Sequence, residues 1–184
     1  AQVSAVARGA TLAALRERGG RLRTATGLVQ APARAEASAI ELGPQDLVVI
    51  AVKGPALTQV AQGVAPLLGP HTVVLPAMNG VPWWFCQGVA GFGGGALESV
   101  DPGGAIAAAI PFDCVLGCVV HAATSTPEPG LVQHNFGQGL IVGEPRGEAA
   151  GRSERTRAVA DLLAHAGFEV THSADVRQAI WYKL

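Results

Sequence analysis

Two apolar runs flank a segment of helical periodicity in the first half of the chain. Residues 46–53 form a continuous β-branched apolar run between polar residues, which is typical of a strand buried on both faces. Apolar side chains then recur at helical spacing over residues 55–69, with Pro55 suited to the first turn. A second buried strand is expected at residues 72–75. This strand–helix–strand order predicts a parallel βαβ unit, and with it the α/β class.

Further elements are expected on both sides of this unit. Residues 10–18 are expected to form a helix that ends at Gly19-Gly20, since glycine suits the residue after a helix. A helix is expected after Ser153 and another after Asp175, because both residue types cap helix N-termini. The remaining expected elements are strands at residues 3–7, short strands with turns in 21–42, and strands at 114–121, 139–143 and 168–171.

The composition argues against several classes of partner. Net charge is −1, and no Lys or Arg occurs between Lys53 and Arg146, so we expect no nucleic-acid partner. No apolar run approaches the ~18 residues that cross a membrane, so we expect no membrane association. No secretory signal opens the chain, and its 3 cysteines are an odd number, which favours reduced thiols and a cytoplasmic protein.

Polar residues follow the expected buried strands at the places where α/β sheets bind ligands. Lys53 ends the first strand and offers a point charge for phosphate. Asn79-Gly80 follows the second, and the amide supplies both donors and acceptors. A solvated lysine and an ordinary turn explain these residues equally well. Arg8 follows the opening strand and favours the 2′-phosphate of NADP if that strand is the second of a dinucleotide fold. Otherwise it is a surface arginine.

Two apparent motifs do not fit their context. Residues 91–96 (Gly-Phe-Gly-Gly-Gly-Ala) match a phosphate-binding fingerprint by letters, but no strand precedes them and no helix follows, so we expect a flexible loop. Cys114, Cys118 and His121 are close in sequence. On one strand, however, the two cysteines share a face and the histidine points to the other. Buried thiols are therefore favoured over a zinc site.

Lys183 lies near the end of the chain in the helix expected after Asp175. It follows Ile180 by three residues, which places it near the buried side. A partly buried lysine in a cleft can act as a proton donor. A lysine that extends from the edge of an apolar face to solvent is the alternative.

Seven short segments, taken in order, resemble the ketopantoate reductase (2-dehydropantoate 2-reductase) family. The resemblance covers nearly the whole chain. The segments are Val6-Ala7-Arg8-Gly9, residues 46–53, Asn79-Gly80-Val81-Pro82-Trp83-Trp84-Phe85, residues 117–123, residues 129–134, Ile141-Val142-Gly143-Glu144 and Ile180-Trp181-Tyr182-Lys183-Leu184. The adjacent aromatics Trp83-Trp84-Phe85 are compatible with a substrate or dimer surface and equally with core packing.

The resemblance implies a Rossmann-like, mostly parallel NADP-binding domain that lacks the first strand and the glycine-rich turn. Residues 1–173 would form this partial domain, and 174–184 would begin an all-helical domain for substrate binding and dimerisation. By resemblance, Arg8 and Lys53 hold the 2′-phosphate of NADPH, Asn79 lies beside the nicotinamide and the substrate, and Ala123 contacts the cofactor through its backbone. Lys183 matches the catalytic lysine, which also contacts the substrate, polarises its keto oxygen and donates the proton.

The implied activity is NADPH-dependent reduction of ketopantoate to pantoate, a step toward pantothenate and coenzyme A. A homodimer through the helical domain is a further implication. We expect this 184-residue piece alone to bind NADPH poorly and to be inactive. A reductase of another 2-oxo acid on the same scaffold remains an alternative, as does a non-catalytic NADP-binding module.

Overall fold

A computed structural model of the chain describes residues 1–92, 97–147 and 153–184. The elements divide into two compact units. Unit 1 comprises Ala1–Gly43 and Ala122–Gly137, and unit 2 comprises Pro44–His121 and Gln138–Leu184. Of the glycine-rich segment at 91–96, residues 93–96 lie outside the described residues.

Unit 1 opens with short strands and one helix. The elements are β1 (Ser4–Val6), α1 (Gly9–Arg18), β2 (Gly20–Thr24), β3 (Gly27–Ala31), β4 (Arg34–Glu36) and the 3-10 turn Ala39–Glu41. β1 and β4 pair in parallel, whereas β2 and β3 form an antiparallel pair. Gly19 ends α1 at φ 68°, and a Cβ there would lie 2.3 Å from the carbonyl oxygen of Ala31. The predicted glycine cap is confirmed, and only glycine fits it.

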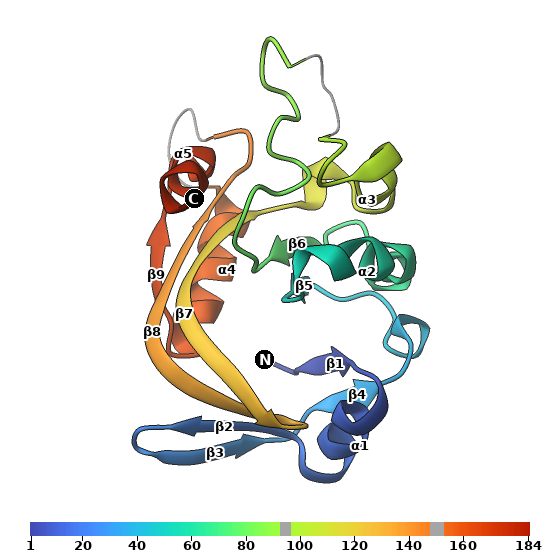
Figure 1. Cartoon of the computed structure of the whole chain (residues 1–184), viewed down its shortest axis with the longest axis vertical. Helices are drawn as coiled ribbons and strands as arrows, with labels where there is room; N and C mark the ends of the chain where they lie inside the picture. The colour runs from blue at the N-terminus through green and yellow to red at the C-terminus, as the bar shows by residue number, and fades with distance from the viewer. Residues whose placement is uncertain (93–96, 148–152) are drawn as a thin grey trace. The chain divides into compact units, whose positions relative to one another are not determined.

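The predicted βαβ unit lies in unit 2 (Figure 1). Its elements are β5 (Leu47–Ile50), the 3-10 turn Gly54–Ala56, α2 (Leu57–Val64), the 3-10 turn Ala65–Leu67 and β6 (Val73–Pro76). β5 and β6 run parallel, with Leu47 opposite Val73. All of β6 is buried, as predicted. The prediction for β5 is wrong on one point: Val49 is 49% exposed between buried Val48 and Ile50. Because side chains alternate along a strand, β5 is covered on one face only.

Two long strands belong to a separate sheet from β5 and β6. β7 (Gly117–Glu128) and β8 (Leu131–Gly143) are joined by Pro129-Gly130 and neighbour each other in the order β3-β2-β8-β7. Both are much longer than the strands predicted at 114–121 and 139–143. The added residues, 122–137, belong to unit 1, where β8 pairs in parallel with β2. Pairing with a distant strand therefore extends these segments beyond their apolar pattern.

The last elements surround the core of unit 2. They are the 3-10 turn Pro102–Gly104, α3 (Ala105–Ala109), the 3-10 turn Phe112–Cys114, α4 (Glu154–His165), β9 (Glu169–His172) and α5 (Val176–Lys183). β9 pairs in parallel with β8. The predicted caps are confirmed, since the side chains of Ser153 and Asp175 accept hydrogen bonds from Thr156 N and Gln178 N. The core cluster combines β6, β7, β8 and α4 and contains Val73, Leu75, Leu116, Cys118, Leu140, Val142, Val159 and Ala160.

A charged pair fixes the start of α4. Arg155 donates two hydrogen bonds to Glu144, from Nε at 2.8 Å and Nη2 at 2.5 Å, and also donates to the backbone carbonyl of Asp113. The hydroxyl of Ser153 donates to Glu144 Oε1 at 2.6 Å. Burial raises the pKa of Glu144, but the donors from Arg155 and Ser153 outweigh it and hold the pKa below its usual value.

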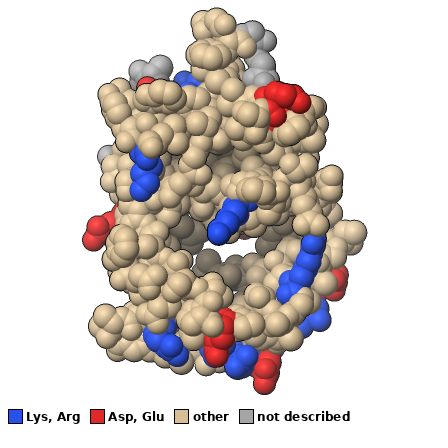
Figure 2. Space-filling model, in the orientation of Figure 1, with Lys and Arg blue, Asp and Glu red and all other residues tan. Residues whose placement is uncertain are grey.

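The fold class is confirmed as mixed α/β with mostly parallel strand pairing. Within the described residues, no helix combines the length and the apolar character needed to cross a membrane. On the face seen in Figure 2, Lys and Arg are scattered among uncharged residues. This agrees with the low charged fraction of 15%.

Candidate active site

Two glycines seat α5 against the sheet of unit 2. Val176, at the start of α5, is fully buried. A Cβ at Gly117 of β7 would lie 2.6 Å from Val176 Cγ1, and a Cβ at Gly143 of β8 would lie 2.4 Å from the carbonyl oxygen of Ser173. Real side chains do not approach that closely. The two glycines therefore let α5 pack directly on β7 and β8.

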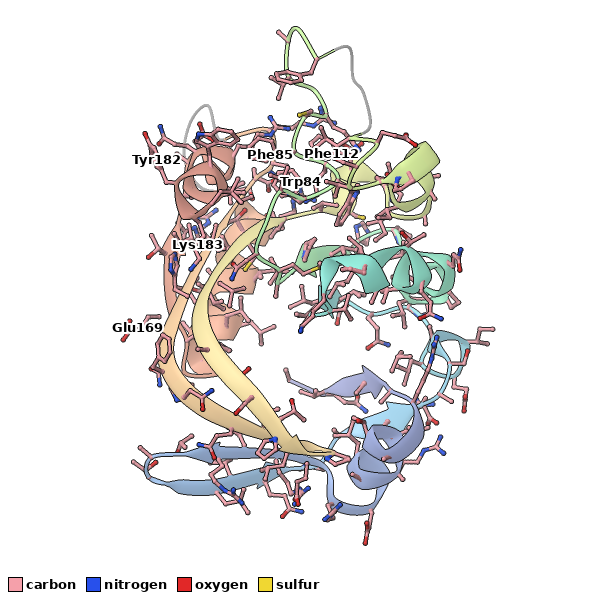
Figure 3. The ribbon with its side chains drawn as sticks, in the orientation of Figure 1. Trp84, Phe85, Phe112, Glu169, Tyr182 and Lys183 are labelled. Atoms are coloured by element: carbon pink, nitrogen blue, oxygen red, sulfur yellow. The ribbon has the colours of Figure 1, made fainter. Side chains whose placement is uncertain are left out.

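The far end of α5 reaches the same face of β7 four residues further along. Gly117 and His121 share a face because side chains alternate along the strand. Four residues of strand span roughly 13 Å, and the seven steps from Val176 to Lys183 span roughly 10–11 Å of helix. The lengths match. Lys183 Nζ lies 3.2 Å from His121 Nδ1. Figure 3 labels Lys183 together with its neighbour Tyr182 of α5.

Lys183 lines a polar cavity of about 440 Å³. The cavity is lined by His121, Ile141, Ser173, Asp175, Gln178, Ala179, Tyr182 and Lys183. The expectation that Lys183 is partly buried is wrong, since the residue is exposed. Lys183 follows Val176 by seven residues and Ile180 by three, so it lies on the same side of α5 as these buried residues, at the exposed end of the helix.

Asn79 lies at a second, larger cavity of about 530 Å³. This cavity opens beside the end of β6, and its lining includes Trp83, Trp84, Cys118 and Ile180. The two tryptophans are each 1% exposed, so core packing is their role here. No hydrogen-bond partner for either indole N–H is present among the described residues. Burial also raises the pKa of Cys118 to about 12, which keeps it a neutral thiol.

β7 links the two cavities through consecutive residues. The amide N–H of Val120 donates to Asn79 Oδ1 at 3.2 Å, and the next residue, His121, contacts Lys183. Gly80 follows Asn79 at φ 98°, a conformation that favours glycine and turns the chain away from β6. Asn79 and Lys183 therefore line different cavities but are both anchored to the middle of β7.

The predicted phosphate ligands follow strand ends. Lys53 is exposed and precedes the 3-10 turn that leads into α2, in unit 2. Arg8 is exposed at the N-cap of α1, in unit 1, where Ala123 also lies, half-buried in β7. Neither cation forms an ion pair with a residue that the structure describes. Both charges are thus free for an anionic group such as a cofactor phosphate.

His121 is the site residue that the sequence did not reveal. In the sequence it stood as a partner of Cys114 and Cys118 and as part of the segment 117–123 that carries the resemblance, without a role of its own. Cys114 instead lies in a 3-10 turn, and the described residues contain no group of three or more His, Cys, Asp or Glu that could hold a metal ion. The signal that could have found His121 is its position on β7, directly after Val120. The amide N–H of Val120 contacts the predicted site residue Asn79.

Comparison with known proteins shows which proteins this chain resembles. Residues 1–83 match the family described as ketopantoate reductase PanE/ApbA. A curated 2-dehydropantoate 2-reductase from Mesorhizobium japonicum is 45% identical over 183 residues. The chain is thus similar to ketopantoate reductases over nearly its whole length. That alignment covers 99% of this chain and 55% of the relative.

Solved structures extend the likeness to the whole domain. A presumed ketopantoate reductase from Ralstonia solanacearum MolK2 has a TM-score of 0.92 and 46% identity, covering 99% of this chain and 56% of that one. A PanE/ApbA family ketopantoate reductase from Ralstonia eutropha JMP134 has a TM-score of 0.74 and 25% identity, covering 99% and 52%. The predicted Rossmann-like fold is confirmed. The chain spans about half the length of these relatives.

Proposed function

We propose that the full-length protein containing this domain is an NADP-dependent oxidoreductase that reduces 2-dehydropantoate to pantoate. The observation that carries the proposal is the 45% identity to a curated 2-dehydropantoate 2-reductase across 99% of the chain. The two polar residues assigned to the reaction, Asn79 and Lys183, line different cavities and contact consecutive residues of β7, Val120 and His121. We also place the protein in the cytoplasm, on the route to pantothenate and coenzyme A.

Lys183 is the proposed proton donor. Reduction of a keto group develops negative charge on its oxygen, and a nearby ammonium stabilises that charge and supplies the proton. The ammonium has three N–H donors. One reaches His121, so two remain for the substrate.

Asn79 is the proposed positioning group. Its Oδ1 is engaged by Val120 N, which fixes the amide and leaves the Nδ2 donors free to face the cavity. An amide held in this way can orient a carboxamide or a 2-oxo acid without adding charge. The aromatic wall of the larger cavity excludes water around it.

The charged residues at the strand ends fit a phosphate-bearing cofactor. Lys53 and Arg8 are exposed and have no ion-pair partner among the described residues, which suits binding of the 2′-phosphate that distinguishes NADPH from NADH. The backbone of Ala123 is the third proposed contact. NADPH, when bound, supplies the hydride. We further propose that residues 174–184 lead into a helical domain that completes the substrate site and forms a homodimer.

A substrate and cofactor panel tests the proposal. The full-length protein is assayed with NADPH and with NADH against 2-dehydropantoate, pyruvate, 2-oxoisovalerate and phenylglyoxylate. We expect the highest kcat/KM with 2-dehydropantoate and NADPH. A clear preference for another 2-oxo acid would replace the substrate but keep the reaction class, and no turnover with any pair would leave a binding module. The 184-residue chain alone, assayed in parallel, is expected to show no turnover.

A further inference from the structure

The contact between Lys183 and His121 specifies which imidazole nitrogen carries the proton. An ammonium donates hydrogen bonds and has no lone pair with which to accept one. At 3.2 Å from Lys183 Nζ, His121 Nδ1 must therefore be the acceptor, and the proton of the neutral ring sits on Nε2. The assignment follows from the chemistry of the partner.

The neighbouring strand leaves room for the imidazole. A Cβ at Gly139 of β8 would lie 3.1 Å from His121 Cβ and 3.9 Å from its Cγ. Any side chain at position 139 would crowd the base of the imidazole. With glycine there, the ring keeps the orientation that brings Nδ1 to Lys183.

The partner of Lys183 is an imidazole and not a carboxylate. In the part of the chain that the structure describes, no acidic side chain forms an ion pair with Lys183. Asp175 lines the same cavity, but its Oδ1 accepts the hydrogen bond that caps α5. A carboxylate would compete with a developing alkoxide for the ammonium proton. A neutral imidazole orients the amine without neutralising its charge.

We propose that His121 is the positioning residue of Lys183. Its Nδ1 holds one N–H of the ammonium and aims the other two donors into the polar cavity, where the keto oxygen of the substrate would be reduced. The inference rests on the proposed function for its kinetic consequence. The His121–Lys183 pairing itself can be measured without turnover.

The first test is the tautomer of His121. The full-length protein is labelled with ¹⁵N-histidine, and His121→Asn identifies the resonances that belong to this ring. We expect an unprotonated Nδ1 and a protonated Nε2 at neutral pH, with the Nδ1 resonance shifted in Lys183→Ala. A proton on Nδ1, or ring resonances that are unmoved by Lys183→Ala, would overturn the pairing.

The second test is kinetic and uses a matched pair of substitutions. In His121→Asn, the amide oxygen can occupy nearly the same position as Nδ1. In His121→Leu, the side chain has a volume similar to that of histidine but no hydrogen-bond acceptor. We expect His121→Leu to lower kcat by about tenfold to a hundredfold, the scale of one charged hydrogen bond. KM and the Kd for NADPH should stay within about twofold, since only the reacting step is affected. His121→Asn should recover most of the lost kcat.

The melting temperatures of the two variants distinguish a positioning role of His121 from a structural role. His121 is exposed, so neither variant should lower the melting temperature appreciably. Equal kcat in wild type and His121→Leu, or a loss shared by both variants together with a lower melting temperature, would overturn the positioning role. If the wild type reduces no 2-oxo acid, the proposed function fails, and the tautomer measurement still decides whether Lys183 and His121 are paired.

Discussion

The two cavities of unit 2 differ in how deeply their lining side chains are buried. The larger one is lined by buried Trp83, Trp84 and Cys118, with Thr58, Asn79 and Ser99 as its polar side chains. The smaller one is lined mainly by exposed polar residues of α5 and by His121. Substitutions in the first should therefore act mainly on folding, and substitutions in the second mainly on turnover. In the same way, buried Val176 holds α5 in place, whereas exposed residues of α5 line the smaller cavity.

The largest effect on stability is expected in the aromatic cavity. Trp84→Ala removes a side chain that is 1% exposed and contacts the region of Gly117. Its loss should cost about 3–5 kcal/mol of unfolding free energy, measured by urea denaturation of the full-length protein. Tyr182→Ala is the matched control in the polar cavity, because Tyr182 is 80% exposed. It should change stability by less than about 0.5 kcal/mol. Equal costs would remove the distinction between the cavities.

The seat of α5 gives the next largest effect. Gly143→Ala places a methyl group 2.4 Å from the carbonyl oxygen of Ser173, and we expect it to lower the unfolding free energy by about 2–3 kcal/mol. It should also lower kcat, because the shift moves Lys183. Gly63→Ala is the control, since Gly63 lies inside α2 with nothing within 4 Å. That change should be neutral or stabilising by up to about 1 kcal/mol. A harmless Gly143→Ala would show that α5 does not depend on this contact.

Asn79 tests the polar side of the larger cavity. Asn79→Ala should lower kcat/KM by about tenfold to a hundredfold, because substrate orientation is lost. Asn79→Asp keeps an oxygen for Val120 N but lacks the Nδ2 donors. It should lose a similar factor if those donors face the reactants. Wild-type activity in Asn79→Asp would mean that Asn79 serves only to hold β7.

The smallest expected effect is a pH dependence of stability that arises at Glu144, which lines neither cavity. The pKa of Glu144 is lowered in the folded protein by the donors of Arg155 and Ser153, which outweigh burial. A lowered folded pKa means that the stabilisation is present above the unfolded value near 4.5 and is lost as pH falls through the folded value. Glu144→Gln should therefore cost about 1 kcal/mol at neutral pH and flatten the acid limb of the stability curve. An unchanged acid limb would contradict this.

The sequence predicted the elements whose signals are local. Gly19, Ser153 and Asp175 mark helix ends by their own chemistry, and the βαβ unit follows from apolar runs that need no partner to be recognised. The sequence failed for β7 and β8, because residues 122–137 are mostly small or polar and are held as strands in part by pairing with β2. Val49 of β5 is exposed for a similar reason: a run of apolar residues does not indicate which face of the strand is covered.

The candidate site divides in the same way. Asn79, Lys53 and Lys183 could be picked out because they follow strands or belong to a recognisable segment. The partner of Lys183 could not, since His121 is 62 positions away and its contact depends on two glycines that let α5 lie along β7. The separation of Asn79 and Lys183 into different cavities was equally invisible, because it depends on which side of α5 faces the sheet.

The role of Lys183 is tested most directly by the turnover of 2-dehydropantoate with NADPH in the full-length protein and its Lys183→Ala variant, with cofactor affinity measured on the same samples. The account predicts that kcat falls by about a hundredfold to ten-thousandfold, as expected for loss of a proton donor, while the Kd for NADPH stays the same. A Lys183→Ala protein that keeps its kcat within about threefold of wild type would contradict it.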